Sequence, residues 1–86
     1  MGSYSIEFAK SVRKDFKGIP RNDAERILKR ISSLSREPRP PDSKKLSNED
    51  AYRIRVGSYR VIYEIRDQLI VVIILKVGHR KDIYRR

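Results

Sequence analysis

Three arginines stand close together in residues 52–65, which read YRIRVGSYRVIYEI. Arg53 and Arg55 precede a Gly-Ser pair, and Arg60 follows it. A guanidinium presents a planar fork of donors that can hold two phosphate oxygens, and its fixed charge stabilises the extra negative charge of a pentavalent phosphorus transition state. The chemistry that these residues favour is phosphate recognition, and with it cleavage of a phosphodiester bond.

The alternation of residue types in this stretch predicts a β-hairpin that holds the arginines together. With the Gly-Ser pair as a two-residue turn, Arg55 lies directly opposite Arg60, and Arg53 lies two residues farther along the same face. Like charges that oppose each other cost a sheet roughly 0.2–1 kcal/mol, so the arginines favour a ligand site; a solvated edge of a basic protein is the alternative. The other face of the hairpin is apolar and consists of Tyr52, Ile54, Val56, Tyr59, Val61, Tyr63 and Ile65.

The C-terminal stretch is expected to add basic and aromatic side chains to the arginine face. With Asp67 and Gln68 as the next turn, the register puts Leu75 beside Arg60. A tyrosine near such a site could stack on an unpaired base, or it could cover the apolar edge of the sheet. The chain continues as VGHRKDIYRR, which brings four more side chains close to the arginines: His79, Arg80, Lys81 and Tyr84.

Proton transfer has fewer candidates in this sequence. His79 is the only histidine, and its ordinary pKa of about 6.5 suits a general base; the alternative is a residue that only packs or caps a turn. Glu64, on the arginine face, is a second candidate. Positioning and electrostatic stabilisation could also supply the rate without a base. No cluster of carboxylates accompanies the arginines, so the sequence favours metal-independent chemistry and no cofactor.

Composition and charge narrow the class of protein. The chain has 86 residues, which suit a single domain over residues 1–86, and a formal charge of +10, which predicts a polyanionic partner. It has no cysteine, so a reducing cytoplasm is the expected compartment. Its longest apolar run, residues 69–75, is far shorter than the roughly 20 residues of a membrane-spanning helix, so no membrane association is expected.

The elements that must position the arginines follow from the hydrophobic periodicity. Residues 4–8 alternate as a short strand, and from Ala9 the spacing of apolar residues becomes helical as far as Gly18, a plausible C-terminal cap. Basic residues on this helix favour a solvated face, or contact with ribosomal RNA as the alternative. A second helix follows Pro20, and its expected apolar stripe is Ala24, Ile27, Leu28, Ile31 and Leu34.

The rest of the chain is predicted to be a loop and three strands. Residues 36–45 contain three prolines and form a connection, and strands are expected at 51–56, 59–66 and 69–77. The last of these is apolar on both faces, as in a central or covered strand. The expected fold class is α+β with the order βααβββ, in which a helical hairpin covers one face of a mostly antiparallel sheet and leaves the arginine face open.

The stretches KKLSNEDAYRIRVGSYRVIYEI and LKVGHRKDIYRR resemble the RelE branch of the RelE/ParE toxins, which are the toxin halves of bacterial and archaeal toxin–antitoxin pairs. The resemblance covers nearly the whole chain. It implies a microbial-ribonuclease-like fold and an endoribonuclease that cuts messenger RNA in the ribosomal A site, where the 2′-hydroxyl attacks the adjacent phosphate. Such an mRNA interferase inhibits translation and arrests growth. The implied partners are the ribosome with its 16S RNA, the messenger, and an acidic antitoxin that joins the toxin in a hetero-oligomer.

The resemblance also implies roles for individual residues. Arg53 and Arg55 match paired basic residues on one strand, and Arg60 matches a phosphate-binding arginine on the next. Arg80 matches the arginine after the Gly-His step, and Tyr84 matches a tyrosine that orients or stacks on the substrate. Studied relatives carry lysines at the first two positions, and an arginine cannot give up its proton as a lysine can. The alternative function is that of a ParE-like inhibitor of DNA gyrase, which has the same fold but no nuclease activity.

Overall fold

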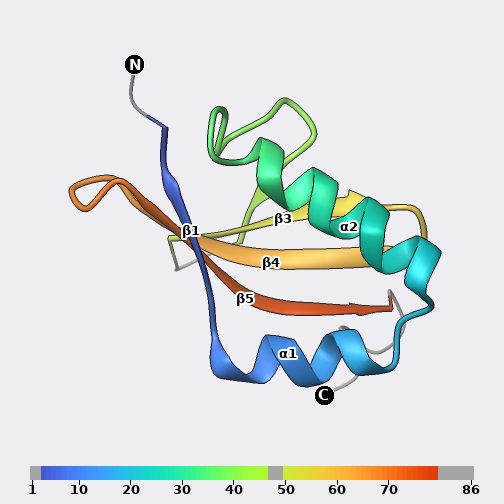
Figure 1. Ribbon diagram of the computed structural model, residues 1–86. Coiled ribbons are helices and arrows are strands. Elements are labelled where there is room, and N and C mark those ends of the chain that lie inside the picture. Colours follow the sequence, from blue (N-terminus) through green and yellow to red (C-terminus); the bar gives the residue numbers. More distant parts are fainter. Residues whose placement is uncertain (1–2, 47–49, 80–86) are drawn as a thin grey trace.

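The computed structural model describes residues 3–46 and 50–79 of the chain (Figure 1). A five-stranded sheet has the order β1-β5-β4-β3-β2, with β1 parallel to β5 and the other neighbours antiparallel. The α+β class and the mostly antiparallel sheet are as the sequence predicts, and the short strand β2 is an addition. The elements are β1 (Ser5–Phe8), α1 (Lys10–Lys17), α2 (Arg21–Ser33), β2 (Lys44–Lys45), β3 (Ala51–Val56), β4 (Tyr59–Arg66) and β5 (Val71–His79).

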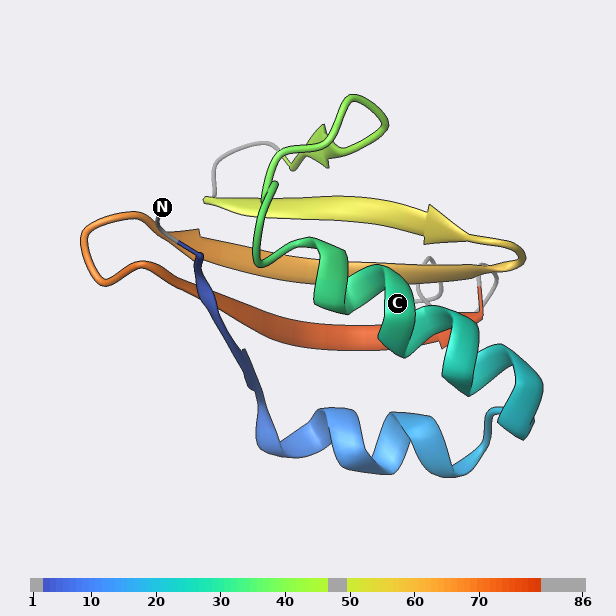
Figure 2. The same ribbon diagram turned by 45° about the horizontal axis from the view of Figure 1, so that its top comes forward.

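The two helices leave one face of the sheet open. In Figures 1 and 2, α2 lies across the face of the sheet and α1 lies beside β5. Neither helix has the length and apolar character that crossing a membrane requires. The face of the sheet opposite α2 is covered by neither helix (Figures 1 and 2).

The helices begin and end where the sequence predicts. At the end of α1 the C-cap residue is Gly18, and the backbone N–H of the following Ile19 donates to the carbonyl of Phe16 over 3.1 Å; at the start of α2 the carbonyl of Pro20 accepts the N–H of Ala24. Leu28 was expected in the buried stripe of α2, and this expectation is wrong, because its side chain is 44% exposed. It follows Ile27 directly, and successive residues of a helix point about 100° apart, so Leu28 points sideways toward α1 while Ile27 points at the sheet.

The core lies between the helices and the apolar face of the hairpin. Burial of these side chains is the main stabilising term of the fold, at about 25 cal/mol per Å² of apolar surface. The hairpin face that the sequence predicts as apolar supplies Ile54, Val61, Tyr63 and Ile65 to the core, with Tyr52, Val56 and Tyr59 packed against it. The remaining buried residues of the core are Val12, Ile27, Ile31, Leu34, Val72, Ile74 and Val77.

The hairpin between β4 and β5 differs from the predicted one. The turn takes in residues 67–70, so Arg66 pairs with Val71, and a β-bulge shifts the register after Ile62, which pairs with Lys76. The prediction that Leu75 lies beside Arg60 is therefore wrong, and Gly78 occupies that place. The longer turn was hidden because its last two residues are apolar, although Leu69 is 69% exposed.

Polar contacts tie the proline-rich loop to the sheet. The Tyr63 hydroxyl donates to the carbonyl of Pro38 over 2.7 Å, and burial raises the pKa of Tyr63 to about 12. Arg39 forms an ion pair of 2.8 Å with Asp67 in the β4–β5 turn, and the Tyr4 hydroxyl donates to the same carboxylate over 2.7 Å. These two donors, Arg39 first, hold the pKa of Asp67 below its usual range.

Candidate phosphate-binding site

The hairpin of β3 and β4 has the register that the sequence predicts. Arg55 pairs with Arg60, and Arg53 pairs with Ile62. Because Ile54 and Val61 on the alternate positions are buried in the core, the three arginines lie on the face of the sheet opposite the helices. Arg55 is exposed and Arg53 is half-buried. Two of the arginines thus stand on neighbouring strands, whose backbones lie about 4.8 Å apart, and the third stands two residues along β3.

Arg60 differs from the other two arginines in being buried, with a side chain that is only 2% exposed. Its neighbour across β4 and β5 is Gly78, which has no side chain to compete for the space above the sheet. A guanidinium keeps its charge at any physiological pH, and a charge away from water acts on a nearby anion through a lower dielectric. This burial distinguishes Arg60 from a solvated cation such as Arg55.

A fourth cation joins this face from β2, which sequence reasoning missed. Lys44 pairs with Arg53, and residues that lie directly opposite in an antiparallel pair share a face. Two residues are too few to show the alternation that predicts a strand, and the preceding prolines indicated a loop. The pair of lysines before Leu46 was the only available signal.

His79 lies at the predicted end of the sheet but points to its other side. It pairs with Tyr59, and the two rings make an edge contact with their centroids 5.6 Å apart. Tyr59 packs against the core on the helix-facing side, as Val77 does. Of the two readings of His79, proton transfer and packing, this geometry favours packing.

Glu64 lies on the arginine face, as predicted, but away from the arginine pair. It pairs with Ala51 and Ile73, and its carboxylate forms an ion pair of 3.3 Å with Arg66. Glu64 lies four positions along β4 from Arg60, a distance of about 13 Å. Glu64 is therefore poorly placed to take a proton at a phosphate held by the arginines.

The remaining predicted site residues, Arg80, Lys81 and Tyr84, lie outside the described residues. In residues 3–46 and 50–79, no group of three or more histidine, aspartate or glutamate side chains is arranged to hold a metal ion. The arrangement on the open face is cationic, and what it can do chemically is bind and stabilise phosphate oxygens.

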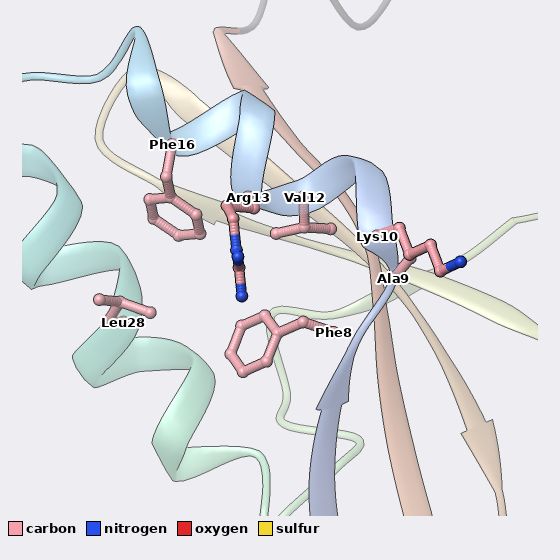
Figure 3. A pocket seen from close by; sticks show the side chains of 7 residues that line it. All are labelled: Phe8, Ala9, Lys10, Val12, Arg13, Phe16 and Leu28. Atoms are coloured by element: carbon pink, nitrogen blue, oxygen red, sulfur yellow. The ribbon is translucent and has the colours of Figure 1, made fainter.

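An apolar groove lies between α1 and α2, and Arg53, Arg55 and Arg60 are not among its lining residues (Figure 3). It has a volume of about 610 Å³, and Figure 3 shows Phe8, Phe16 and Leu28 pointing toward its interior. Phe8 is 48% exposed, which is unusual for a phenylalanine beside a helix pair. Basic side chains of α1, Lys10 and Arg13, also line the groove.

Comparison with known proteins agrees with this architecture. The model of the family described as "ParE toxin of type II toxin-antitoxin system, parDE" matches residues 6–84. A toxin named RelG from Mycobacterium tuberculosis is 37% identical over 86 residues, which cover 96% of this chain and 98% of the relative. The mRNA interferase toxin RelE of Escherichia coli is 26% identical over 81 residues, which cover 92% of this chain and 85% of the relative.

Solved structures of toxin–antitoxin complexes contain chains with the same fold. The toxin–antitoxin complex RelBE2 of M. tuberculosis has a chain that superimposes with a TM-score of 0.80 at 32% identity, covering 91% of this chain and 99% of that chain. The RelBE complex of E. coli gives a TM-score of 0.80 at 25% identity, covering 90% of this chain and 96% of that chain. The chain therefore belongs to the ParE toxin family of type II toxin–antitoxin systems, in its RelE branch.

Proposed function

We propose that this protein is an endoribonuclease that cleaves messenger RNA in the A site of the ribosome and so inhibits translation. The observation that carries the proposal is the opposition of Arg55 and Arg60, with Arg53 beside them, on the face that the helices leave open. This arrangement costs strand-pairing energy and suits a phosphate. The E. coli relative, named an mRNA interferase, supports the choice of messenger RNA. The proposal places the protein in the cytoplasm, where ribosomes translate.

The proposed reaction is an internal transfer at one phosphate of the messenger. The 2′-oxygen attacks the adjacent phosphorus, so an O2′–P bond forms and the P–O5′ bond breaks. Water takes up the proton of the 2′-hydroxyl and supplies the proton that the 5′-oxygen gains. Arg55, which is exposed, holds the non-bridging oxygens, and the buried charge of Arg60 stabilises the extra negative charge as the fifth bond to phosphorus forms. Arg80 and Tyr84 are proposed to complete the site, the tyrosine by stacking on a base.

No side chain of the described residues is proposed as the base. Arg53 and Arg55 cannot accept a proton from the 2′-hydroxyl in their charged form, and His79 faces Tyr59 on the other side of the sheet. The rate then depends on orientation and charge stabilisation, with the ribosome holding the messenger in a reactive geometry. Well-oriented reactants gain up to about 7–11 kcal/mol from this effect.

The proposed protein partner is an acidic antitoxin. The solved relatives from M. tuberculosis and E. coli are described as toxin–antitoxin complexes. The groove between α1 and α2 offers such a partner an apolar floor with basic side chains beside it, and the chain as a whole carries a charge of +10. We assign the groove to an antitoxin segment with apolar residues flanked by acidic ones, because that chemistry matches both features.

The proposed activity can be tested with purified protein, programmed ribosomes and the same messenger without ribosomes. Primer extension maps the cut sites in each sample. The expected result is cleavage of the ribosome-bound messenger alone. Equal cleavage of free RNA would show a general ribonuclease, and no cleavage with accumulation of gyrase–DNA adducts would support the ParE-like alternative; either result would overturn the proposal.

A further inference from the structure

Two pairs of like charges stand next to each other on the open face of the sheet. Lys44 of β2 pairs with Arg53 of β3, and Arg55 of β3 pairs with Arg60 of β4. Because Arg53 and Arg55 are two residues apart on one strand, they lie about 6.8 Å apart on the same face. The four cations therefore form a compact block that spans three strands and ends at the β2 edge of the sheet.

Two basic residues of the sheet are paired with carboxylates. Arg66 lies 3.3 Å from Glu64, and Lys76 lies 3.6 Å from Asp15. Lys44, in contrast, is exposed and forms no ion pair with any residue in the described ranges 3–46 and 50–79. Each opposed like-charge pair costs roughly 0.2–1 kcal/mol, and two such pairs side by side are a stronger indication of an anionic ligand than one.

We propose that Lys44 binds a second phosphate of the RNA, adjacent to the phosphate held by Arg55 and Arg60. This inference rests on the proposed function, and it adds a direction: the RNA backbone crosses the strands from β4 toward the β2 edge. Lysine suits this position because its ammonium is a compact charge on a flexible stem. Such a side chain can bind a phosphate that does not itself react and needs no fixed orientation. Lys44 is a binding residue, since the reacting phosphate lies at the arginines.

The neighbouring residue provides a matched control. Lys45 has the same charge, is also exposed and belongs to the same two-residue strand, but it pairs with Tyr52, so it lies on the helix-facing side. A Lys44→Gln variant and a Lys45→Gln variant change the net charge equally. Only the first removes a charge from the open face.

The test measures binding of each full-length variant to a single-stranded RNA that carries 2′-O-methyl groups throughout and so cannot be cleaved. Fluorescence anisotropy over a series of salt concentrations gives the slope of log K against log salt. Each phosphate contact on a single strand contributes about 0.7 to this slope. We expect Lys44→Gln to lose about 0.7 and to bind severalfold more weakly, while Lys45→Gln and Lys44→Arg keep the slope of the wild type.

Two results would overturn the inference: a wild-type slope for Lys44→Gln, or equal losses for Lys44→Gln and Lys45→Gln. Circular dichroism checks that each variant is folded. The methylated RNA cannot be cleaved and only its binding is measured, so the result does not depend on the proposed nuclease activity. Failure of the wild type to cut ribosome-bound messenger would instead reject the proposed function.

Discussion

The backbone N–H of Val77 donates a hydrogen bond of 3.0 Å to the Asp15 carboxylate, which joins the end of β5 to α1. Pairing of β1 with β5 stops at Phe8 and Ile74, so the rest of β5 is an edge toward α1. Unpaired edges invite pairing with other chains, and buried N–H groups need an acceptor. The Asp15 carboxylate accepts the N–H of Val77 and so covers this part of the edge. Its other oxygen lies 3.6 Å from the ammonium of Lys76.

Asp15→Ala is expected to destabilise the fold by about 1–3 kcal/mol, because it leaves the N–H of Val77 without an acceptor in a site where Val77 is 1% exposed. Urea unfolding followed by circular dichroism measures the loss. Lys76→Gln removes only the half-exposed ion pair and should cost about 0–1 kcal/mol. Equal losses in the two variants would show that the ion pair, and not the hydrogen bond, is what matters.

Arg55→Thr is expected to separate activity from stability. It removes the like charge opposite Arg60 and introduces a residue that favours strands, so the free energy of unfolding should stay the same or rise by up to about 1 kcal/mol. Cleavage of ribosome-bound messenger should fall about 10²-fold or more, since a charge that stabilises the transition state is lost. Arg66→Thr changes a residue of the same face that is paired with Glu64, and it should keep wild-type cleavage. Full cleavage by Arg55→Thr would remove Arg55 from the site.

Leu28→Gln is expected to weaken antitoxin binding about tenfold, equivalent to about 1.4 kcal/mol, because Leu28 lines the groove and its apolar contact with the partner would be lost. Titration calorimetry with the purified antitoxin measures the change. Leu69→Gln provides the control, since Leu69 is exposed in the β4–β5 turn and does not line this groove. Loss of affinity in Leu69→Gln alone would move the antitoxin to another surface. Both variants should cleave RNA as the wild type does.

The lowered pKa of Asp67 predicts how the stability of the fold changes at acidic pH. Arg39 and Tyr4 hold its pKa below the usual value of about 3.9 when the chain is folded. The stability that this carboxylate contributes is therefore fully present above pH 4 and is lost as the pH falls through the lower, folded-state pKa. Asp67→Asn should melt at a lower temperature than the wild type at neutral pH, and the difference between the two melting temperatures should shrink as the pH falls below 4. A difference that does not change with pH would show that the charge is not the cause.

Gly57→Ala is expected to cost roughly 1–2 kcal/mol, since Gly57 has a φ of 59° in the β3–β4 turn and a side chain there is strained. The added Cβ would also lie 2.5 Å from a guanidinium nitrogen of Arg26, which would have to move. Gly18→Ala is the control, because a Cβ at Gly18 meets nothing within 4 Å. Thermal unfolding compares the stability of the two variants. An unchanged melting temperature for Gly57→Ala would show that the backbone at this position is not strained by a side chain.

The features that the sequence predicted correctly are those with strong local signals. A two-residue Gly-Ser turn leaves one register for residues 52–65, so the position of Arg55 opposite Arg60 could be read directly. The apolar positions of α2 at Ile27 and Ile31 follow a helical period and are buried as expected.

The missed features have weak local signals or depend on tertiary structure. The strand at Lys44 is too short for a period, and the turn residue Ile70, with a φ of 55°, resembles strand sequence. Leu75 is the unpaired residue of the bulge, and no glycine or proline next to it indicates the bulge in the sequence. The side on which His79 lies depends on that bulge, so it could not be inferred from alternation alone.

The β-bulge at Leu75 decides which face of the sheet the residues at the end of β5 occupy. Side chains alternate between faces, so a register shift of one residue exchanges the faces of every position beyond it. If β5 paired without the bulge, with Leu75 as the partner of Ile62, Gly78 would lie opposite Tyr59 and His79 would move to the face of Arg60. The bulge thus keeps the only imidazole of the sequence off the arginine face and places a glycine opposite Arg60.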